Sequence, residues 1–99
     1  MKKFVFLYNM SGEEENTKEQ IDAWMNWFHS IGKKMVDMGS PLVGGKEVKS
    51  KKAKNITPEM GLVSGYSIVN AADMESAIEI AKGCPGKTGI RVYESVPMG

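Results

Sequence analysis

Residues 62–85 read LVSGYSIVNAADMESAIEIAKGCP, and this stretch predicts a strand followed directly by a helix. The first ten of these residues are rich in β-branched and aromatic side chains, which favours an extended strand. Asp73 stands where a helix N-cap is expected, since its carboxylate can accept a hydrogen bond from the first turn. The inner face of the helix should then carry Met74, Ala77, Ile78 and Ala81. Gly83 and Pro85 are expected to stop it.

A second strand and helix are predicted upstream. Residues 3–9, KFVFLYN, form an apolar strand, and Thr17 with Gln20 has the spacing of a helix capping box. The helix should run to Gly39, with Pro41 unable to continue it. Its apolar stripe, at alternating spacings of three and four, comprises Ile21, Trp24, Phe28, Ile31, Met35 and Met38.

Two further strands complete the expected fold. Residues 42–48, LVGGKEV, are a weaker strand candidate, and the polar residues 49–59 are expected to form a loop or the end of a hairpin. Residues 89–96, GIRVYESV, alternate apolar and polar side chains as a strand with two different faces does. The order β-α-β-β-α-β predicts one α+β domain over residues 1–99. It would be a ferredoxin-like sandwich with an antiparallel four-stranded sheet.

The first strand indicates that a single copy leaves apolar surface uncovered. Phe4, Phe6 and Tyr8 point to one face of the strand, while Val5 and Leu7 point to the other. Two helices cover only one face of such a sheet, so the other face needs a second source of cover. A homodimer packed through the sheet faces, forming a dimeric α+β barrel, is the simplest arrangement. A monomer with a partly apolar open face is the alternative.

The composition limits the kinds of partner and the cellular location that we expect for the protein. Thirteen basic and twelve acidic residues leave a net charge of +1, which argues against nucleic acid as the main partner. No stretch approaches the roughly 20 apolar residues of a membrane helix. The apolar run at the start is too short for a signal peptide, and the lone Cys84 fits a reducing compartment, so we expect a cytoplasmic protein.

No metal or cofactor site is indicated. One histidine and one cysteine, 55 positions apart, do not form a ligand cluster for a metal ion. Residues 81–88, AKGCPGKT, match a loose form of the phosphate-binding loop. That loop follows a strand and opens a helix, whereas here a helix is expected before it and a strand after it.

The first helix contains both tryptophans and the only histidine. The apolar stripe centres near Phe28 and Met35, so Trp24 is expected in the core and Trp27 at its edge, facing a partner or the rim of a pocket. His29 lies about 120° from that centre and is not a core position. It is either an exposed helix histidine or an acid or base at the mouth of a cleft.

A second candidate set lies on the strands. If Ile90 and Val92 face the helices, then Arg91 and Tyr93 face the opposite way. Arg91 is the only arginine, and its guanidinium would suit a carboxylate ligand, with hydroxyl groups added by Tyr66 and Ser67. The equally weighted alternative is an arginine at a strand edge, paired with an acidic neighbour such as Glu94.

These stretches resemble the YCII-related (DGPF-type) family of small proteins. The resemblance covers most of the chain: WMNWFHSIGKKMVDMG with the following SPL, then GYSIVNAADMESAIEIAKGCP, and the closing IRVYES. It implies a ferredoxin-like fold and a dimeric α+β barrel, with a cleft between helices and sheet or at the dimer interface. It also implies a candidate catalytic histidine in the first helix, near His29. The D-G-P-F segment itself is replaced here by ITPEMGLVSGY.

Two classes of function follow from these observations. The first is a homodimer that binds a small anionic or aromatic metabolite, with or without catalysis, in a site lined by Trp27, His29, Tyr66, Ser67, Arg91 and Tyr93. In that site His29 would be the acid or base and Arg91 the anchor. The second is an interaction module without a small-molecule substrate, whose dimer buries the sheet.

Overall fold

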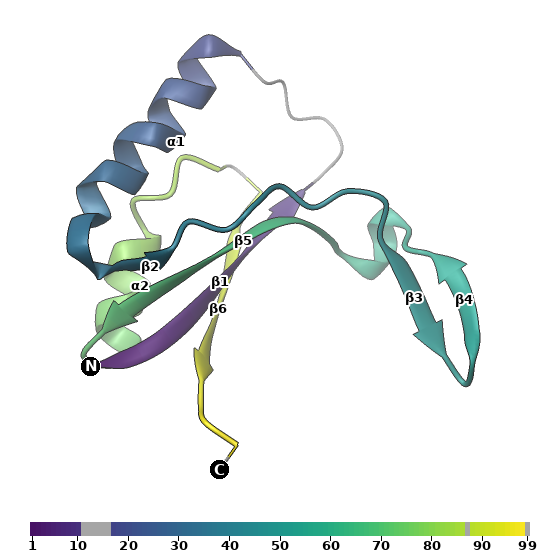
Figure 1. Ribbon diagram of the computed structural model, residues 1–99. Helices are drawn as coiled ribbons and strands as arrows, with labels where there is room; N and C mark the ends of the chain where they lie inside the picture. The colour runs from purple at the N-terminus through teal and green to yellow at the C-terminus, as the bar shows by residue number, and fades with distance from the viewer. Residues whose placement is uncertain (11–16, 87, 99) are drawn as a thin grey trace.

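The described part of the chain folds as an α+β domain with a four-stranded antiparallel sheet and two α-helices (Figure 1). The computed structural model describes residues 1–10, 17–86 and 88–98. The sheet has the order β2-β5-β1-β6, with β1 at Lys2–Met10, β2 at Met35–Asp37, β5 at Leu62–Ala71 and β6 at Ile90–Ser95. Every neighbouring pair in it is antiparallel. Neither helix in this part of the chain is long and apolar enough to cross a lipid bilayer.

Alternation along β1 divides the sheet into a packed face and an open face. Phe4, Phe6 and Tyr8 are buried, while Val5 and Leu7 on the other side are only partly covered. The pairing of β1 with β5 and β6 extends the same two faces to these neighbouring strands. The packed face continues through Gly65, Ser67, Val69 and Ala71 on β5 and through Ile90 and Val92 on β6. The expectation that Ile90 and Val92 face the helices is therefore confirmed.

Helix α1 spans Lys18–Ile31, which is shorter than expected. Thr17 caps it as the sequence indicates, since its hydroxyl accepts a hydrogen bond from the Gln20 N–H at 3.1 Å. The predicted end at Gly39 is wrong, because Gly32 at φ 61° turns the chain one residue after Ile31. Met35 and Met38, which extended the helical stripe in the sequence, lie beyond the helix end.

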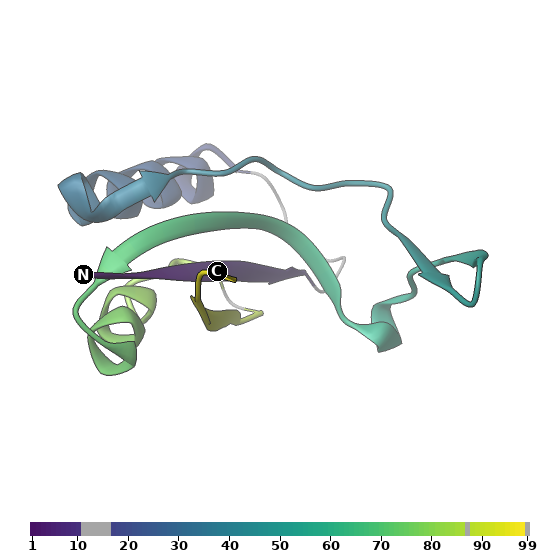
Figure 2. The same cartoon turned by 60° about the horizontal axis from the view of Figure 1, so that its bottom comes forward.

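The second strand of the sheet is also misplaced in the sequence prediction. A short 3-10 turn, η1 at Gly32–Lys34, leads straight into β2, which pairs with β5. Part of the predicted strand 42–48 belongs instead to β3 at Lys46–Lys49, which pairs with β4 at Lys52–Asn55. These two strands form a separate hairpin that extends away from the main sheet (Figures 1 and 2).

The turns around this hairpin agree with their residues. Ser50 and Lys51 take positive φ at the tip, as the two central residues of a tight hairpin turn do. A second 3-10 turn, η2 at Pro58–Met60, then leads into β5. The polar segment 49–59, expected to be a loop or the end of a hairpin, contains the hairpin tip.

Helix α2 spans Met74–Ala81 and follows β5 as the opening stretch predicts. Ala77 and Ala81 are buried in the core as expected, but Met74 and Ile78 remain exposed, and Ile80 packs in their place. The segment after α2 leads to β6, so it lacks the strand-then-helix order of a phosphate-binding loop. Residue 87 in that segment lies outside the described residues.

Both helices pack on the same face of the sheet. The core joins Trp27 and Ile31 of α1 and Ala77 and Ala81 of α2 to the packed-face side chains. The open face, which includes Val5, Leu7, Ile68 and Tyr93, is covered by neither α1 nor α2.

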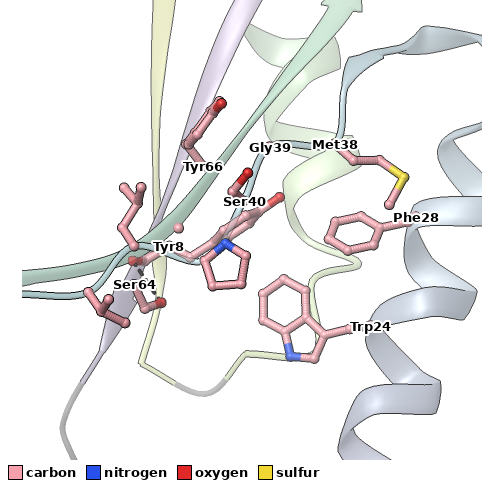
Figure 3. A pocket seen from close by; sticks show the side chains of 12 residues that line it. Tyr8, Trp24, Phe28, Met38, Gly39, Ser40, Ser64 and Tyr66 are labelled. Atoms are coloured by element: carbon pink, nitrogen blue, oxygen red, sulfur yellow. Dashed lines mark hydrogen bonds between the residues drawn. The ribbon is translucent and has the colours of Figure 1, made fainter.

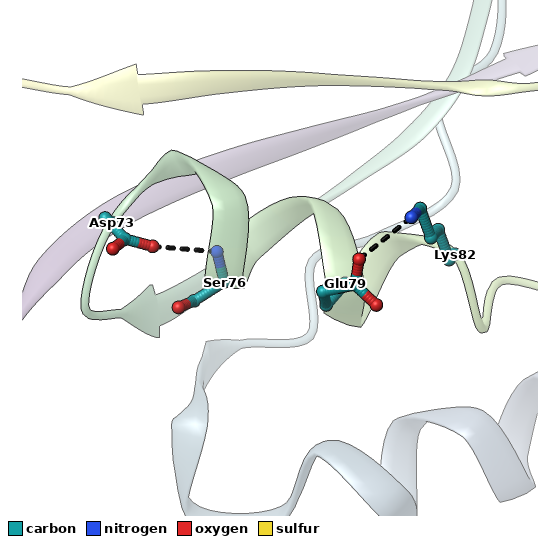
Figure 4. A network of polar contacts seen from close by, with 4 residues as sticks. All are labelled: Asp73, Ser76, Glu79 and Lys82. Atoms are coloured by element: carbon teal, nitrogen blue, oxygen red, sulfur yellow. Dashed lines mark hydrogen bonds and ion pairs between the residues drawn. The ribbon is translucent and has the colours of Figure 1, made fainter.

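Asp73 caps α2, with its Oδ1 accepting from the Ser76 N–H at 2.8 Å (Figure 4). Hydrogen bonds from the Ser76 backbone and then its hydroxyl, with a smaller contribution from Lys2, lower the pKa of Asp73 below its ordinary 3.8. The ionised form is therefore favoured in the folded state, and this stability is present above pH 3.8 and disappears as the pH falls through the lowered value. An Asp73→Ala variant should melt at a lower temperature than the wild type at pH 7.

Asp73→Asn provides the matched control, because asparagine keeps the cap acceptor without a titrating group. Melting curves followed by circular dichroism between pH 2.5 and 7 should show a smaller loss of stability toward acid pH in the Asn variant than in the wild type. Identical pH profiles for the two proteins would contradict this role of Asp73.

Candidate functional site

A pocket of about 480 Å³ opens between α1, the start of β5 and the segment that follows β2 (Figure 3). Helix α1 contributes Trp24 and Phe28, and the packed face of the sheet contributes Tyr8. The remaining lining residues come from two stretches of backbone that lie side by side: Met38, Gly39, Ser40, Pro41, Leu42 and Val43, and Ser64, Gly65 and Tyr66. This size and its mostly apolar lining are typical of a small-molecule site.

Gly39 determines how closely the wall of the pocket approaches β5. The residue has φ 76°, and a Cβ built on it would lie 1.7 Å from the backbone oxygen of Tyr66. Only glycine allows this approach. The Asp37 carboxylate accepts the Gly39 N–H at 2.8 Å and holds the turn.

Past Gly39, the wall continues along β5. Pro41 forms a β-bridge with Gly65, and the Leu42 N–H donates to the Ser64 carbonyl at 2.9 Å. A proline fits here because the bridge does not depend on its missing N–H. The segment after β2 therefore behaves as an irregular continuation of the edge strand.

A bulge positions Ser64. The register of β1 and β5 shifts after Tyr8, which pairs with Gly65, while Asn9 pairs with Val63. Ser64 is therefore the extra residue, and its hydroxyl donates to the Tyr8 carbonyl at 3.3 Å. Figure 2 shows that β5 is strongly curved along its length.

Three aromatic rings form one side of the pocket. Tyr8 and Trp24 meet edge to face with centroids 4.9 Å apart, and the Trp24 and Phe28 centroids are 5.8 Å apart. Edge-to-face and tilted pairs of this kind are favoured by the charge distribution of the rings. The pairs also limit the motion of Trp24, which is only half-buried and faces the pocket.

A chain of two hydrogen bonds lies behind the aromatic wall. The Tyr8 hydroxyl donates to Ser67 Oγ at 2.6 Å, and the Ser67 hydroxyl donates to the Met38 carbonyl at 2.7 Å. Burial raises the pKa of Tyr8 to about 12, against the opposing effect of the Ser67 hydrogen bond. The phenol is therefore neutral at physiological pH.

Two of the residues predicted to line a site lie on opposite faces of β5. Tyr66 is on the open face opposite Leu7, and its ring points away from Trp24 and Phe28 in Figure 3. Ser67 is on the packed face and fully buried. The structure therefore does not bring their hydroxyls together, although Tyr66 lines the pocket and Ser67 supports Tyr8 behind it.

The expected placement of the two tryptophans is reversed. Trp27 is 7% exposed, stacks on Phe6 and donates its indole N–H to the Ile80 carbonyl at 3.1 Å. Trp24, expected in the core, is the one that lines the pocket. Ile21, which belongs to the predicted stripe, is 51% exposed, so the buried face of α1 lies closer to Trp27 and Ile31 than the stripe predicts.

The remaining predicted residues lie outside the pocket. His29 is exposed on α1, which agrees with its expected position off the core. Arg91 and Tyr93 belong to the open face, as expected, and both are exposed. Arg91 extends toward Gly61, where an added Cβ would lie 3.5 Å from its guanidinium. The acidic residue named as its alternative partner, Glu94, pairs with Lys2 at 3.7 Å instead.

Sequence reasoning missed Tyr8, Phe28, Pro41 and Ser64 as lining residues. A phenol at the end of an otherwise apolar run was the available signal for Tyr8, because a buried hydroxyl needs a partner. Nothing local in the sequence indicates Pro41 or Ser64, since both are placed by pairing across the sheet edge.

Among residues 1–10, 17–86 and 88–98 there is no group of three or more His, Cys, Asp or Glu side chains placed to hold a metal ion. Among known proteins, no family model matches the chain, and no curated protein matches it either.

The close approach at Gly39 can be tested against a second left-handed glycine. Gly44 has φ 66°, but a Cβ added there meets nothing within 4 Å. Gly44→Ala should therefore cost only the left-handed strain of about 1–2 kcal/mol. Gly39→Ala should cost more than about 3 kcal/mol, because the methyl group also clashes with backbone. Urea denaturation measures both, and equal losses would contradict the close packing at Gly39.

Proposed function

We propose that the protein binds a small aromatic molecule in the pocket between α1 and the segment after β2. The observation that carries the proposal is the aromatic wall of Tyr8, Trp24 and Phe28 along a pocket of about 480 Å³. A planar ligand could pack against these rings edge to face or offset, and each such pair adds roughly 0.5–1.5 kcal/mol beyond area burial.

The lining favours an aromatic ligand over an anionic one. None of the twelve lining residues, all of them within the described part of the chain, is lysine, arginine or histidine. A carboxylate placed there would lose its hydration without gaining a cationic partner. Arg91, which was expected to anchor a carboxylate, is exposed on the open face. The proposal is therefore one of binding, and no catalytic role is assigned to His29.

We further propose a ferredoxin-like fold and membership of the YCII-related family. Along the chain, β1, α1, β2, β5, α2 and β6 follow the order β-α-β-β-α-β, with the hairpin inserted between the two middle strands. The sheet order β2-β5-β1-β6 supports this proposal, together with the motifs in α1, β5 and α2 that carry the resemblance. A cytoplasmic location is proposed from the single cysteine.

The protein is also proposed to be a homodimer packed through its open sheet face. Val5 pairs with Ile68 on one side and Tyr93 on the other, so apolar and aromatic side chains occupy the middle of that face. Tyr93 is 55% exposed in the single chain. The same face supports the alternative function, an interaction module whose only role is to associate.

A thermal-shift screen with small aromatic metabolites tests the ligand proposal. A compound that binds the folded state raises the melting temperature by mass action. Trp24→Leu should weaken the dissociation constant of any hit at least about tenfold, because the ligand loses its main ring contact. His29→Ala and Arg91→Ala serve as controls and should leave that constant unchanged. Compounds whose dissociation constant is unchanged by Trp24→Leu, but which no longer bind Arg91→Ala, would place the site on the open face of the sheet instead.

Sedimentation tests the dimer. A Val5→Lys variant should dissociate a dimer built on the open face, because it buries an unpaired charge at the centre of the interface. Val48→Lys on the hairpin, where the side chain is 70% exposed, is the matched control. A wild-type species of 10.9 kDa at micromolar concentration would contradict the dimer.

A further inference from the structure

Behind the pocket, two hydrogen bonds link Tyr8 to Ser67 and Ser67 to the Met38 carbonyl. The carbonyl at the end of this chain determines the direction of both bonds. The Met38 carbonyl can only accept, so the single Ser67 proton must be the one on the 2.7 Å contact between them. Ser67 Oγ then has no proton left for Tyr8, so at 2.6 Å it accepts the phenolic proton. The Tyr8 proton is therefore directed away from the pocket.

Tyr8 consequently offers the pocket an acceptor only. Its oxygen retains lone-pair capacity, while its one proton is used in a buried bond of normal length. Figure 3 shows the Tyr8 side chain between β5 and the aromatic side chains of α1. Burial keeps the phenol protonated, since its pKa is raised to about 12, so the bond to Ser67 is retained across physiological pH.

Three further polar groups of the wall have their protons used within the protein. The Ser64 hydroxyl donates to the Tyr8 carbonyl, so its oxygen too is left as an acceptor. The N–H groups of Gly39 and Leu42 are both used within the wall, by Asp37 and by the Ser64 carbonyl. Tyr8 and Ser64 therefore present oxygens that a ligand can donate to, and the N–H groups of Gly39 and Leu42 are already used. The lining also contains donors outside this set, namely the indole N–H of Trp24 and the hydroxyls of Ser40 and Tyr66. Selection by hydrogen-bond direction is therefore a property of Tyr8 and not of the whole pocket.

We propose that Tyr8 selects the ligand by hydrogen-bond direction, favouring aromatic molecules that place an O–H or N–H donor against its oxygen over those that place a carbonyl, ether or carboxylate there. This inference rests on the proposed function, because it concerns the same pocket. Tyr8 is the specificity-determining residue, and Ser67 is a positioning residue that acts through it. The ligand class is that of phenols, aryl amines and N–H heteroaromatics.

The first experiment uses 2-naphthol, its methyl ether 2-methoxynaphthalene and 2-naphthoate as probes of matched shape. Dissociation constants are measured by ¹⁵N–¹H NMR titration, which also reports folding through the two tryptophan indole N–H signals. For each probe, the dissociation constant in Tyr8→Phe is compared with that of the same probe in wild type. Differences in hydrophobicity between the probes therefore cancel. Tyr8→Phe should weaken 2-naphthol about fivefold, the value of one hydrogen bond, and leave the ether unchanged. Wild-type protein should bind 2-naphthoate most weakly of the three.

The second experiment reverses the direction of the bond. Ser67→Ala removes the acceptor of the Tyr8 proton, so the phenol becomes able to donate into the pocket. Binding of 2-acetonaphthone, a ketone of similar shape, should strengthen about fivefold relative to 2-naphthol. The double variant Tyr8→Phe, Ser67→Ala should lose this gain, which a general loosening of the pocket would not do.

The outcomes separate this inference from the proposed function. If none of the four probes, nor any aromatic hit from the screen, binds in a manner sensitive to Trp24→Leu, the pocket is not a ligand site and both proposals fail. If the probes bind with that sensitivity, but the ratio of naphthol to ether is the same in wild type and Tyr8→Phe, binding stands and selection by hydrogen-bond direction is overturned. An unchanged preference in a folded Ser67→Ala protein overturns it as well.

Discussion

The indole of Trp27 joins the two helices to the sheet, and the remaining packing depends on it. Its ring lies nearly parallel to Phe6 of β1, at 14° and with centroids 6.2 Å apart, while its N–H donates to the Ile80 carbonyl of α2. One side chain thus provides apolar contact with the sheet and a polar contact that a buried N–H requires. Gly83 leaves room for it, since a Cβ there would lie 2.9 Å from the indole nitrogen. With Trp27 held, Trp24 lies one turn earlier on α1 and faces the pocket.

Local patterns predicted the elements that rest on local interactions. Thr17 and Asp73 cap their helices as their side chains imply, and the strand before α2 forms as its composition favours. The end of α1 was not predicted, because Met35 and Met38 continue the helical spacing by coincidence. Their segment pairs with β5 instead, which satisfies backbone groups along the edge of the sheet. This pairing joins residues more than thirty positions apart, which periodicity in a short window cannot detect.

The candidate site was harder to predict than the fold. Sequence reasoning selected side chains with reactive or charged groups, such as His29 and Arg91, and these are exposed outside the pocket. The pocket is instead defined by a close backbone approach at Gly39 and a bulge at Ser64, which are consequences of pairing between distant segments. Tyr66, which was predicted as a site residue for its hydroxyl, lines the pocket because of its position along β5.

The hairpin of β3 and β4 has a separate consequence for engineering of the protein. Its strands pair with each other and form no part of the four-stranded sheet, and its tip at Ser50 and Lys51 takes the left-handed conformation of a tight turn. Backbone hydrogen bonding in the hairpin is therefore self-contained. A peptide epitope or a small tag grafted between Ser50 and Lys51 would lengthen the hairpin while leaving every core side chain in place. The chain thus carries an attachment point for reporters that is independent of its core.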